Sequence, residues 1–250
     1  MGPPLVLVHG LGGTGAAIWK NHAAELARDF TVVVPDLRGA GGSARPAGPY
    51  SLQDFVGDLH GLVERLELAP TALAGHSFGG SIVLEYAVQH PGDVSAVVAV
   101  GAPTELPDAG REGLRARAET VEHEGMAAVA ETVATNGTAA SFREARPDEL
   151  RAYVELLESA DPASYAATCR AVADLDIGDH LSRIAAPVLL VAGDRDGVAP
   201  PELNARNAER IARASFVEIP DCGHIVPWEK PEALLEAVRP FLREAARVPA

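Results

Sequence analysis

Six short apolar runs, separated by longer segments with helical periodicity, restrict this chain to very few architectures. Most of the runs are continuously apolar rather than alternating, which is typical of strands buried on both faces of a parallel sheet. The alternation of strand and helix signals therefore predicts the α/β class, with a doubly wound, mostly parallel sheet. The runs are residues 4–9 (PLVLVH), 31–36 (TVVVPD), 71–76 (TALAGH), 95–100 (SAVVAV), 187–193 (PVLLVAG) and 215–220 (SFVEIP).

The segments between these runs carry clear helical signals. In residues 51–66, seven apolar side chains recur at spacings of three and four, which predicts one buried helix face. Ser51 followed by Asp54 has the pattern of a capping box, so we expect the helix to begin there. A second helix is expected directly after Ser77, and Pro231 is well placed in the first turn of a last helix.

Residues 104–181 interrupt the alternation, because no convincing strand signal lies within them. We interpret this region as a helical cap over one edge of the sheet, inserted between the core segments 1–103 and 182–250. The dipeptides Asn136-Gly137 and Arg146-Pro147 are expected to separate its helices. The expected helices are residues 111–124, 126–134, 148–159 and 163–173.

Composition excludes several function classes. The 250 residues carry 35 acidic and 21 basic side chains, a net charge of −14, which argues against nucleic acid and anionic membranes as partners. Cys169 and Cys222 form no metal or redox motif, and no metal or cofactor is expected. The N-terminal segment has no signal-peptide pattern, so we expect a cytoplasmic protein. No sequence feature indicates an oligomeric state.

Residues 73–81 (LAGHSFGGS) place Ser77 between two glycines, at the junction of an apolar run and a helical segment. The G-x-S-x-G pattern is a weak signal by itself, because glycine and serine are common in turns. At a strand–turn–helix junction, however, it is typical of a nucleophile exposed at the tip of the turn. The following helix would direct its free N–H groups toward the reacting atoms. A turn without chemistry is the alternative interpretation.

A serine hydroxyl needs a base to become a good nucleophile. Three histidines lie well downstream of Ser77, and they differ in their expected surroundings. His123 is expected on a solvated helix face, and His180 in a loop before a strand. His224 follows the last apolar run, which places it at the same edge of the sheet as Ser77, where doubly wound sheets form their sites. His224 is therefore the candidate base.

Two aspartates follow the fifth apolar run and compete as the acid that would orient the histidine. Asp196 lies further into the loop and can reach across to the histidine loop more easily. Asp194 directly follows Gly193 at the end of the strand, and we expect it to bond the backbone of its turn.

The first apolar run ends in a glycine-rich turn, residues 8–15 (VHGLGGTG). A free backbone N–H at Leu11, paired with that of Phe78, would form the oxyanion hole that such a nucleophile requires. A glycine-rich turn after a strand can also hold phosphate. This turn is not followed by the lysine of a P-loop, so the phosphate interpretation is disfavoured.

With these residues in place, the chain resembles the α/β-hydrolase fold superfamily along nearly its whole length. The resemblance rests on five motifs in order: VHGLGG, PDLRGAGGS, GHSFGG, VAGDRDGVAP and DCGHIVPWEKPEAL. It implies Ser77 as nucleophile, His224 as base and Asp196 as acid, since the family places the acid four residues before a proline, here Pro200. It also implies that the N–H groups of Leu11 and Phe78 form the oxyanion hole, and that residues 104–181 are the cap.

The chain departs from the family pattern in two places. It begins almost directly at PLVLVHG, so the family's leading N-terminal hairpin is expected to be absent and the sheet to have six strands. Ala40 stands where the family frequently has a histidine, a position that is normally structural. Residues 164–196 are similar to the cap exit of 3-oxoadipate enol-lactonases, which points to small capped esterases and lactonases.

The resemblance implies a serine hydrolase that cleaves a small-molecule carboxylic ester or lactone through an acyl-enzyme. A hydrolase of carbon–carbon bonds is the alternative within the fold, and a slow or non-catalytic ligand-binding protein is the alternative outside catalysis. Related dehalogenases and epoxide hydrolases have Asp at the nucleophile position, which makes their chemistry unexpected here. We expect Met126, Phe142 and Tyr165 to roof a mostly apolar pocket, with most charged side chains of the cap on solvated faces. The seven arginines of the cap leave an anionic substrate as an open alternative.

Overall fold

All six strands lie in one sheet with the order β2-β1-β3-β4-β5-β6, and every neighbouring pair is parallel. The computed structural model describes residues 2–247. Chain order reverses between β1 and β3, which creates the switch point where parallel sheets place their ligands. The strands are β1 (Pro4–Val8), β2 (Thr31–Val33), β3 (Thr71–His76), β4 (Val94–Val100), β5 (Val188–Gly193) and β6 (Ala214–Ile219).

Burial along the strands follows their position in the sheet. Every residue of the central strands β3 and β5 is buried, as the continuous apolar runs predict, whereas the edge strand β2 is only half buried. The run expected at 31–36 forms a strand only as far as Val33. Pro35 has no N–H to donate to a ladder, which explains why the strand does not extend through it.

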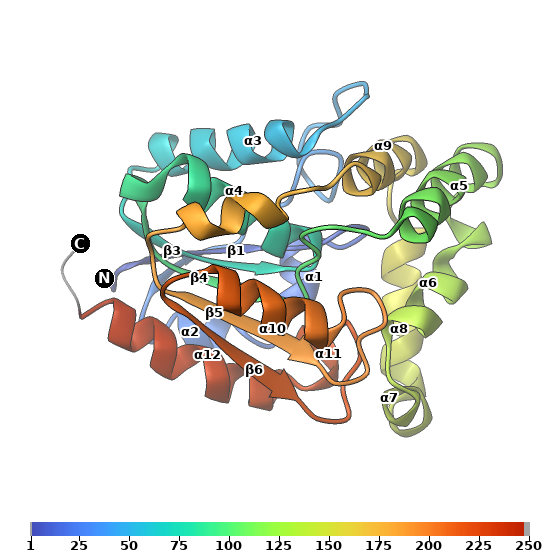
Figure 1. The fold of residues 1–250 in the computed structure, drawn as a ribbon. Helices are drawn as coiled ribbons and strands as arrows, with labels where there is room; N and C mark the ends of the chain where they lie inside the picture. The colour runs from blue at the N-terminus through green and yellow to red at the C-terminus, as the bar shows by residue number, and fades with distance from the viewer. Residues whose placement is uncertain (1, 248–250) are drawn as a thin grey trace.

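Helices cover both faces of the sheet (Figure 1). One face is covered by α3 (Leu52–Arg65), α4 (Phe78–Gln89), α10 (Pro201–Arg210) and the short η3 (Gly178–Arg183). The other is covered mainly by α12 (Pro231–Ala245), beside α1 (Gly15–Ile18) and α2 (Ala23–Leu26). The capping box predicted at Ser51 and Asp54 is present at the start of α3.

The inserted region is helical and lies beyond the carboxyl ends of the strands, on the right of Figure 1. The segment expected as one helix over 126–134 is divided into two, because Val129 is not helical. One helix, α7, was not expected from the sequence. The cap helices are α5 (Asp108–Glu124), η2 (Met126–Ala128), α6 (Ala130–Gly137), α7 (Ala140–Ala145), α8 (Pro147–Glu158) and α9 (Pro162–Ala173).

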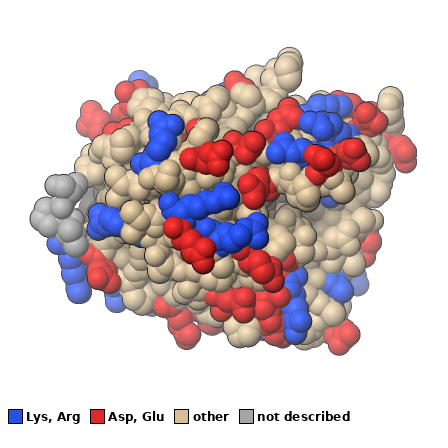
Figure 2. Space-filling model, viewed as in Figure 1, with Lys and Arg blue, Asp and Glu red and all other residues tan. Residues whose placement is uncertain are grey.

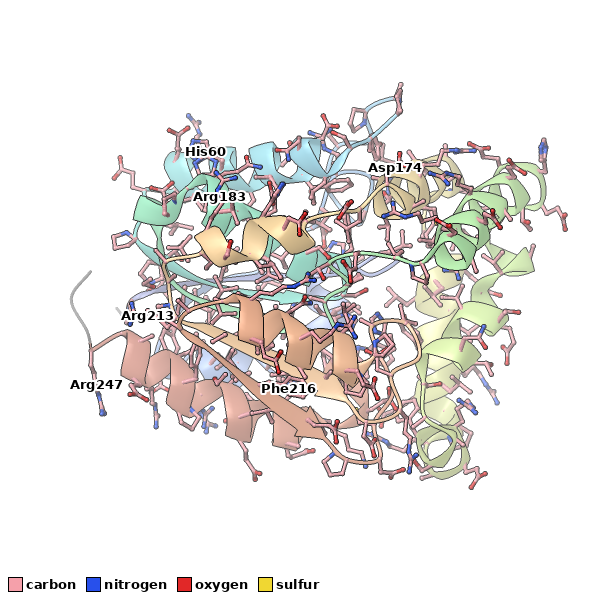
Figure 3. The ribbon with its side chains drawn as sticks, in the orientation of Figure 1. His60, Asp174, Arg183, Arg213, Phe216 and Arg247 are labelled. Atoms are coloured by element: carbon pink, nitrogen blue, oxygen red, sulfur yellow. The ribbon has the colours of Figure 1, made fainter. Side chains whose placement is uncertain are left out.

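The two ends of the insertion are bonded to each other where they leave the core. The Ile177 N–H donates to the Thr104 carbonyl at 2.8 Å, and Glu105 forms an antiparallel bridge with Asp176. Asp174, labelled in Figure 3, lies just after α9 at this junction. This narrow connection joins the cap to the core at two adjacent segments.

The surface in the view of Figure 2 carries acidic and basic side chains side by side, without a broad basic area. Among residues 2–247, no helix combines the length and the apolar character needed to cross a bilayer.

Candidate active site

Ser77 occupies the turn between β3 and α4, as the sequence predicts. Its backbone is in an unusual conformation, with φ of 56° and ψ of −125°, and its N–H donates to the Val100 carbonyl at 2.8 Å. A Cβ at Gly79 would lie 2.5 Å from the carbonyl oxygens of Val8 and His9, so only glycine allows α4 to approach the end of β1 this closely. This close packing holds the strained turn in place.

The three residues predicted as nucleophile, base and acid are brought together although 147 residues separate Ser77 from His224. His224 Nε2 lies 2.8 Å from Ser77 Oγ, and His224 Nδ1 lies 2.8 Å from Asp196 Oδ2. The Asp196 side chain is fully buried and that of His224 almost so. The arrangement can withdraw a proton from the serine hydroxyl and hold the resulting positive charge on the imidazole.

The two competing aspartates have different partners. Asp196 Oδ1 accepts the N–H groups of Val198 and Ala199, each at 2.8 Å, so Asp196 fixes its own turn as well as the histidine. Asp194 Oδ1 accepts the Cys222 N–H at 3.0 Å and thereby joins the β5 loop to the histidine loop. The expectation that Asp194 bonds the backbone of its own turn is therefore wrong; Asp196 has that role.

Two residues that support His224 were missed by the sequence reasoning. His76 Nε2 lies 2.9 Å from the His224 carbonyl oxygen, and burial, followed by the effect of nearby His224, lowers the pKa of His76 to about 3. A neutral imidazole with its proton on Nε2 fits this contact. Buried Glu229 accepts the N–H groups on both sides of His224, from Gly223 at 2.9 Å and Ile225 at 3.1 Å.

Glu229 also accepts the Ala139 N–H at 2.9 Å, so one carboxylate joins the histidine loop to the cap. It lies in α11 (Val226–Glu229), only five residues after His224. An acidic residue inside the apolar stretch IVPWE could have indicated a buried, hydrogen-bonded carboxylate.

The predicted oxyanion-hole residues flank Ser77 from two sides. Phe78 is the first residue of α4, and Leu11 lies in the turn after β1. Within residues 2–247, the N–H groups of Leu11 and Phe78 donate to no protein acceptor. A Cβ at Gly10 would lie 2.8 Å from the Ser77 Cβ, which shows how closely this turn approaches the serine. The two free N–H groups are thus available to a negatively charged oxygen.

A cavity of about 280 Å³ lies between the cap and Ser77. Of the cap residues predicted to line it, Tyr165 does and Met126 and Phe142 do not. Met126 is buried in η2, and the Arg146 guanidinium lies 4.5 Å over the Phe142 ring. The cavity is lined by Gly10, Leu11, Ile18, His76, Ser77, Phe78, Pro103, Leu106, Pro107, Gly110, Leu114, Arg117, Val133, Asn136, Gly137, Tyr153, Tyr165, Val172, Gly197, Val198, His224 and Ile225.

The other two candidate histidines, His123 and His180, lie outside the cavity at Ser77. His123 is exposed near the end of α5, as expected. His180 lies in η3 rather than in a loop, and its Nδ1 is 2.9 Å from a carboxylate oxygen of buried Glu85. Neither lines the cavity at Ser77.

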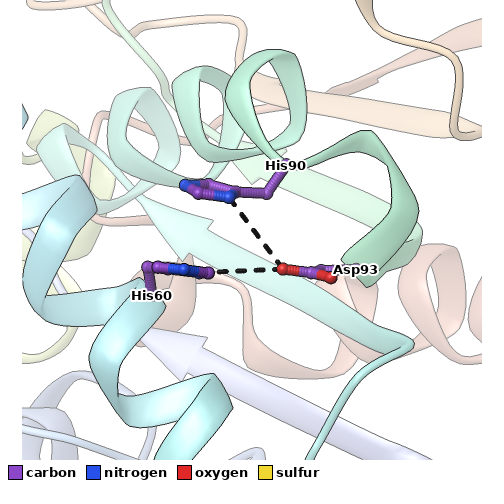
Figure 4. Close-up of side chains that lie close together, drawn as sticks. All are labelled: His60, His90 and Asp93. Carbon is purple, nitrogen blue, oxygen red and sulfur yellow. Dashed lines mark ion pairs between the residues drawn. The ribbon is translucent and has the colours of Figure 1, made fainter.

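His60, His90 and Asp93 form one cluster with metal-ligating atoms, all within 4.8 Å of one another (Figure 4). Asp93 Oδ2 lies 3.7 Å from His60 Nδ1 and 4.0 Å from His90 Nδ1. The two imidazole rings are stacked at 3.9 Å and nearly parallel, so their lone pairs run side by side rather than converge on one ion. His90 follows the last residue of α4, whereas Ser77 precedes its first, so the cluster lies away from the serine.

Comparisons with known proteins find relatives along nearly the whole chain. A model of the α/β-hydrolase fold family matches residues 3–231. 3-oxoadipate enol-lactonase 2 of Acinetobacter baylyi is 28% identical, covering 96% of this chain and 89% of that protein. 2-hydroxy-6-oxo-2,4-heptadienoate hydrolase of Pseudomonas putida is 31% identical, with coverage of 96% and 89%. A thermophilic esterase of Thermogutta terrifontis superimposes with a TM-score of 0.92 at 31% identity, covering 98% of this chain and 91% of that one.

Proposed function

This chain belongs to the α/β-hydrolase fold family, and on that premise we propose that it is a serine hydrolase of carboxylic esters or lactones. The observation that carries the proposal is the hydrogen-bonded series from Ser77 Oγ through His224 to Asp196, with 2.8 Å at both contacts. The similarity to an enol-lactonase and to an esterase supports the same substrate class.

In the first step, Ser77 Oγ attacks the carbonyl carbon of the substrate while its proton moves to His224 Nε2. The carbonyl oxygen becomes negatively charged and accepts the N–H groups of Leu11 and Phe78. Removing one such donor typically costs about 10²–10³ in kcat, so this term is large. Asp196 keeps the imidazole in the tautomer that can accept the proton and stabilises the imidazolium.

The tetrahedral intermediate then collapses. His224 Nε2 gives its proton to the leaving oxygen, the bond between the carbonyl carbon and that oxygen breaks, and Ser77 carries the acyl group. Water attacks the acyl carbon while its proton moves to His224 Nε2, and the return of this proton to Ser77 Oγ releases the acid. In a lactone the leaving hydroxyl stays attached to the acyl chain.

The proposal is tested by labelling with a fluorophosphonate, which forms a stable adduct with an activated serine. We expect a single adduct on Ser77 by intact mass and peptide mapping, and its loss in Ser77→Ala together with nearly all esterase activity. Ser159→Ala, a change at an exposed serine, is the matched control and should label as the unaltered chain does. An adduct on any other residue would refute the assignment of Ser77.

Hydrolysis of a carbon–carbon bond is the second candidate, favoured by the 31% identity to the heptadienoate hydrolase. It would use the same residues but must deliver a proton to carbon rather than to an ester oxygen. A panel of esters, lactones and dienone acids separates the two, because turnover of the dienone acids alone would select the second.

A further inference from the structure

One face of α5 lines the cavity between the cap and Ser77. Gly110, Leu114 and Arg117 are spaced four and three residues apart, which places them along one side of a helix, and all three line the cavity. The helix belongs to the cap, whereas Ser77 and His224 belong to the core. A substrate bound at Ser77 and extending toward the cap would therefore meet Arg117.

The arginines of α5 differ in their partners. Arg111 donates to the carbonyl oxygens of Leu106, Ala173 and Leu175, and Arg115 pairs with Asp174 at 2.6 Å. These two arginines hold α5 against the end of α9. Within residues 2–247, Arg117 has no carboxylate within 4.0 Å, and its guanidinium lies close to the Tyr165 hydroxyl.

Two tyrosines lie beside this guanidinium. Tyr153 and Tyr165 both line the cavity, and the Tyr165 hydroxyl is buried without a hydrogen-bond partner in the described part of the chain. Burial raises the pKa of both phenols, and the Arg117 guanidinium opposes this shift from close by. A buried hydroxyl with no partner is costly, and this one lines the cavity, so a ligand bound there can accept its hydrogen bond.

The charge of the cavity lining differs from that of the chain. Among the described residues that line it, Arg117 is the only one with an acidic or permanently basic side chain. The chain as a whole carries a net charge of −14, which would repel an anion unless a local cation attracts it. A half-buried guanidinium that lines a cavity and has no carboxylate partner is a strong and specific partner for the carboxylate of a ligand.

We propose that Arg117, with the hydroxyls of Tyr153 and Tyr165, forms a carboxylate-binding subsite at the cap end of the cavity. The preferred substrate is then an ester or lactone of an acid that carries a second, free carboxylate. The scissile carbonyl lies at Ser77, and the free carboxylate accepts hydrogen bonds from the guanidinium and a phenol. This inference rests on the proposed hydrolase function, and it takes up the anionic substrate that the arginines of the cap left open.

The test compares two substrates of nearly equal shape. Monomethyl glutarate carries the free carboxylate, and methyl 5-methylhexanoate has an isopropyl group in its place. We expect the unaltered protein to favour the acid in kcat/KM. Arg117→Ala should reduce the acid-to-neutral ratio by about 10- to 100-fold, mainly through KM, because one charge-assisted hydrogen-bonding partner is lost. Tyr165→Phe should reduce the ratio by less, and Arg117→Lys should restore part of it.

Arg115→Ala is the matched control, since it removes an arginine from the same helix but outside the cavity. It should leave the ratio unchanged. The subsite is wrong if Arg117→Ala leaves the ratio unchanged, if Arg115→Ala lowers it equally, or if the unaltered protein prefers the neutral ester.

A binding measurement separates failure of the subsite from failure of the proposed function. Glutarate is titrated by calorimetry into Ser77→Ala and into the double variant Ser77→Ala/Arg117→Ala. We expect binding to weaken by about 10-fold or more in the double variant. Equal binding, or tighter binding of inorganic phosphate than of glutarate, overturns the carboxylate subsite. If no ester is cleaved and no serine is labelled, the hydrolase proposal fails while this titration still decides about Arg117.

Discussion

Among single residues, His224 is held by three side chains, two of which are distant in the sequence. Asp196 bonds its Nδ1, His76 bonds its carbonyl, and Glu229 accepts the N–H groups of both neighbours. These contacts fix both the backbone and the ring of His224 before any substrate binds. Such preorganisation is what a general base requires, because a misplaced imidazole cannot reach the serine proton.

Exchanging each competing aspartate for its amide separates their roles. Asp196→Asn should lower kcat by about 10³–10⁴, because the amide no longer holds the imidazole in the accepting tautomer. Asp194→Asn should lower the free energy of unfolding by about 1 kcal/mol with little effect on kcat, since Asp194 accepts the Cys222 N–H and pairs with exposed Arg195 at 3.6 Å but does not contact His224. Ester turnover and urea unfolding of both variants provide the measurement, and the opposite pattern would show that Asp194 is the acid.

At the scale of helices and strands, the phase of each cap helix decides which side chains reach the substrate. Leu114 and Val172 line the cavity from α5 and α9, although nothing in their local sequence distinguishes them from other apolar cap residues. Met126 is equally buried but faces the interior of the cap. Burial is therefore a poor guide to substrate contact when a helix is covered on two sides.

The pair Leu114 and Met126 tests this distinction with the same substitution at two buried cap positions. Leu114→Ala enlarges the cavity, so we expect the preferred acyl chain to become longer. Met126→Ala should instead lower the free energy of unfolding by about 2–5 kcal/mol and leave the preferred chain length unchanged. Relative kcat/KM over a series of methyl esters is the measurement, and a shift in chain length for Met126→Ala alone would reverse our assignment.

At the scale of the whole molecule, burial of neutral histidines ties stability to pH. His22 lies in the core beside Trp19, and burial lowers its pKa to about 4. Both of its ring nitrogens lack a partner among the described residues. Because the pKa in the unfolded chain is near 6.5, the unfolded state binds the proton more readily. The stabilisation that neutral, buried His22 contributes is therefore fully present above about pH 6.5 and is lost as the pH falls toward 4.

Replacing His22 should reduce the dependence of the unfolding free energy on pH. Between pH 7 and pH 4.5, the unaltered chain should lose about 2–3 kcal/mol of unfolding free energy through His22, a loss absent from His22→Leu. His123→Gln, a change at an exposed histidine, is the control and should keep the full dependence. Urea unfolding at both pH values gives the comparison, and identical slopes for the unaltered chain and His22→Leu would contradict the assignment.

The class of fold and the positions of the proposed catalytic residues along the chain can be predicted from the sequence alone. Continuous apolar runs have few alternatives to a parallel sheet, because only strands covered on both faces bury such residues throughout. Ser77, Asp196 and His224 follow β3, β5 and β6, and the carboxyl ends of parallel strands meet at one edge. Their approach to one another therefore follows from local signals combined with the rule for connecting parallel strands.

The residues that surround that site depend on how the whole chain packs. Met126 and Phe142 do not line the cavity because cap helices pack against each other as well as over it, so amphipathic spacing does not say which neighbour an apolar side chain meets. The role of Glu229 depends on its hydrogen bonds to Gly223 and to Ala139 of the cap. The role of Arg117 depends on its place in the cavity lining. Neither can be recognised from the neighbouring residues in the sequence. Local periodicity fixes the face of an element, whereas only the packing of the whole chain determines what that face contacts.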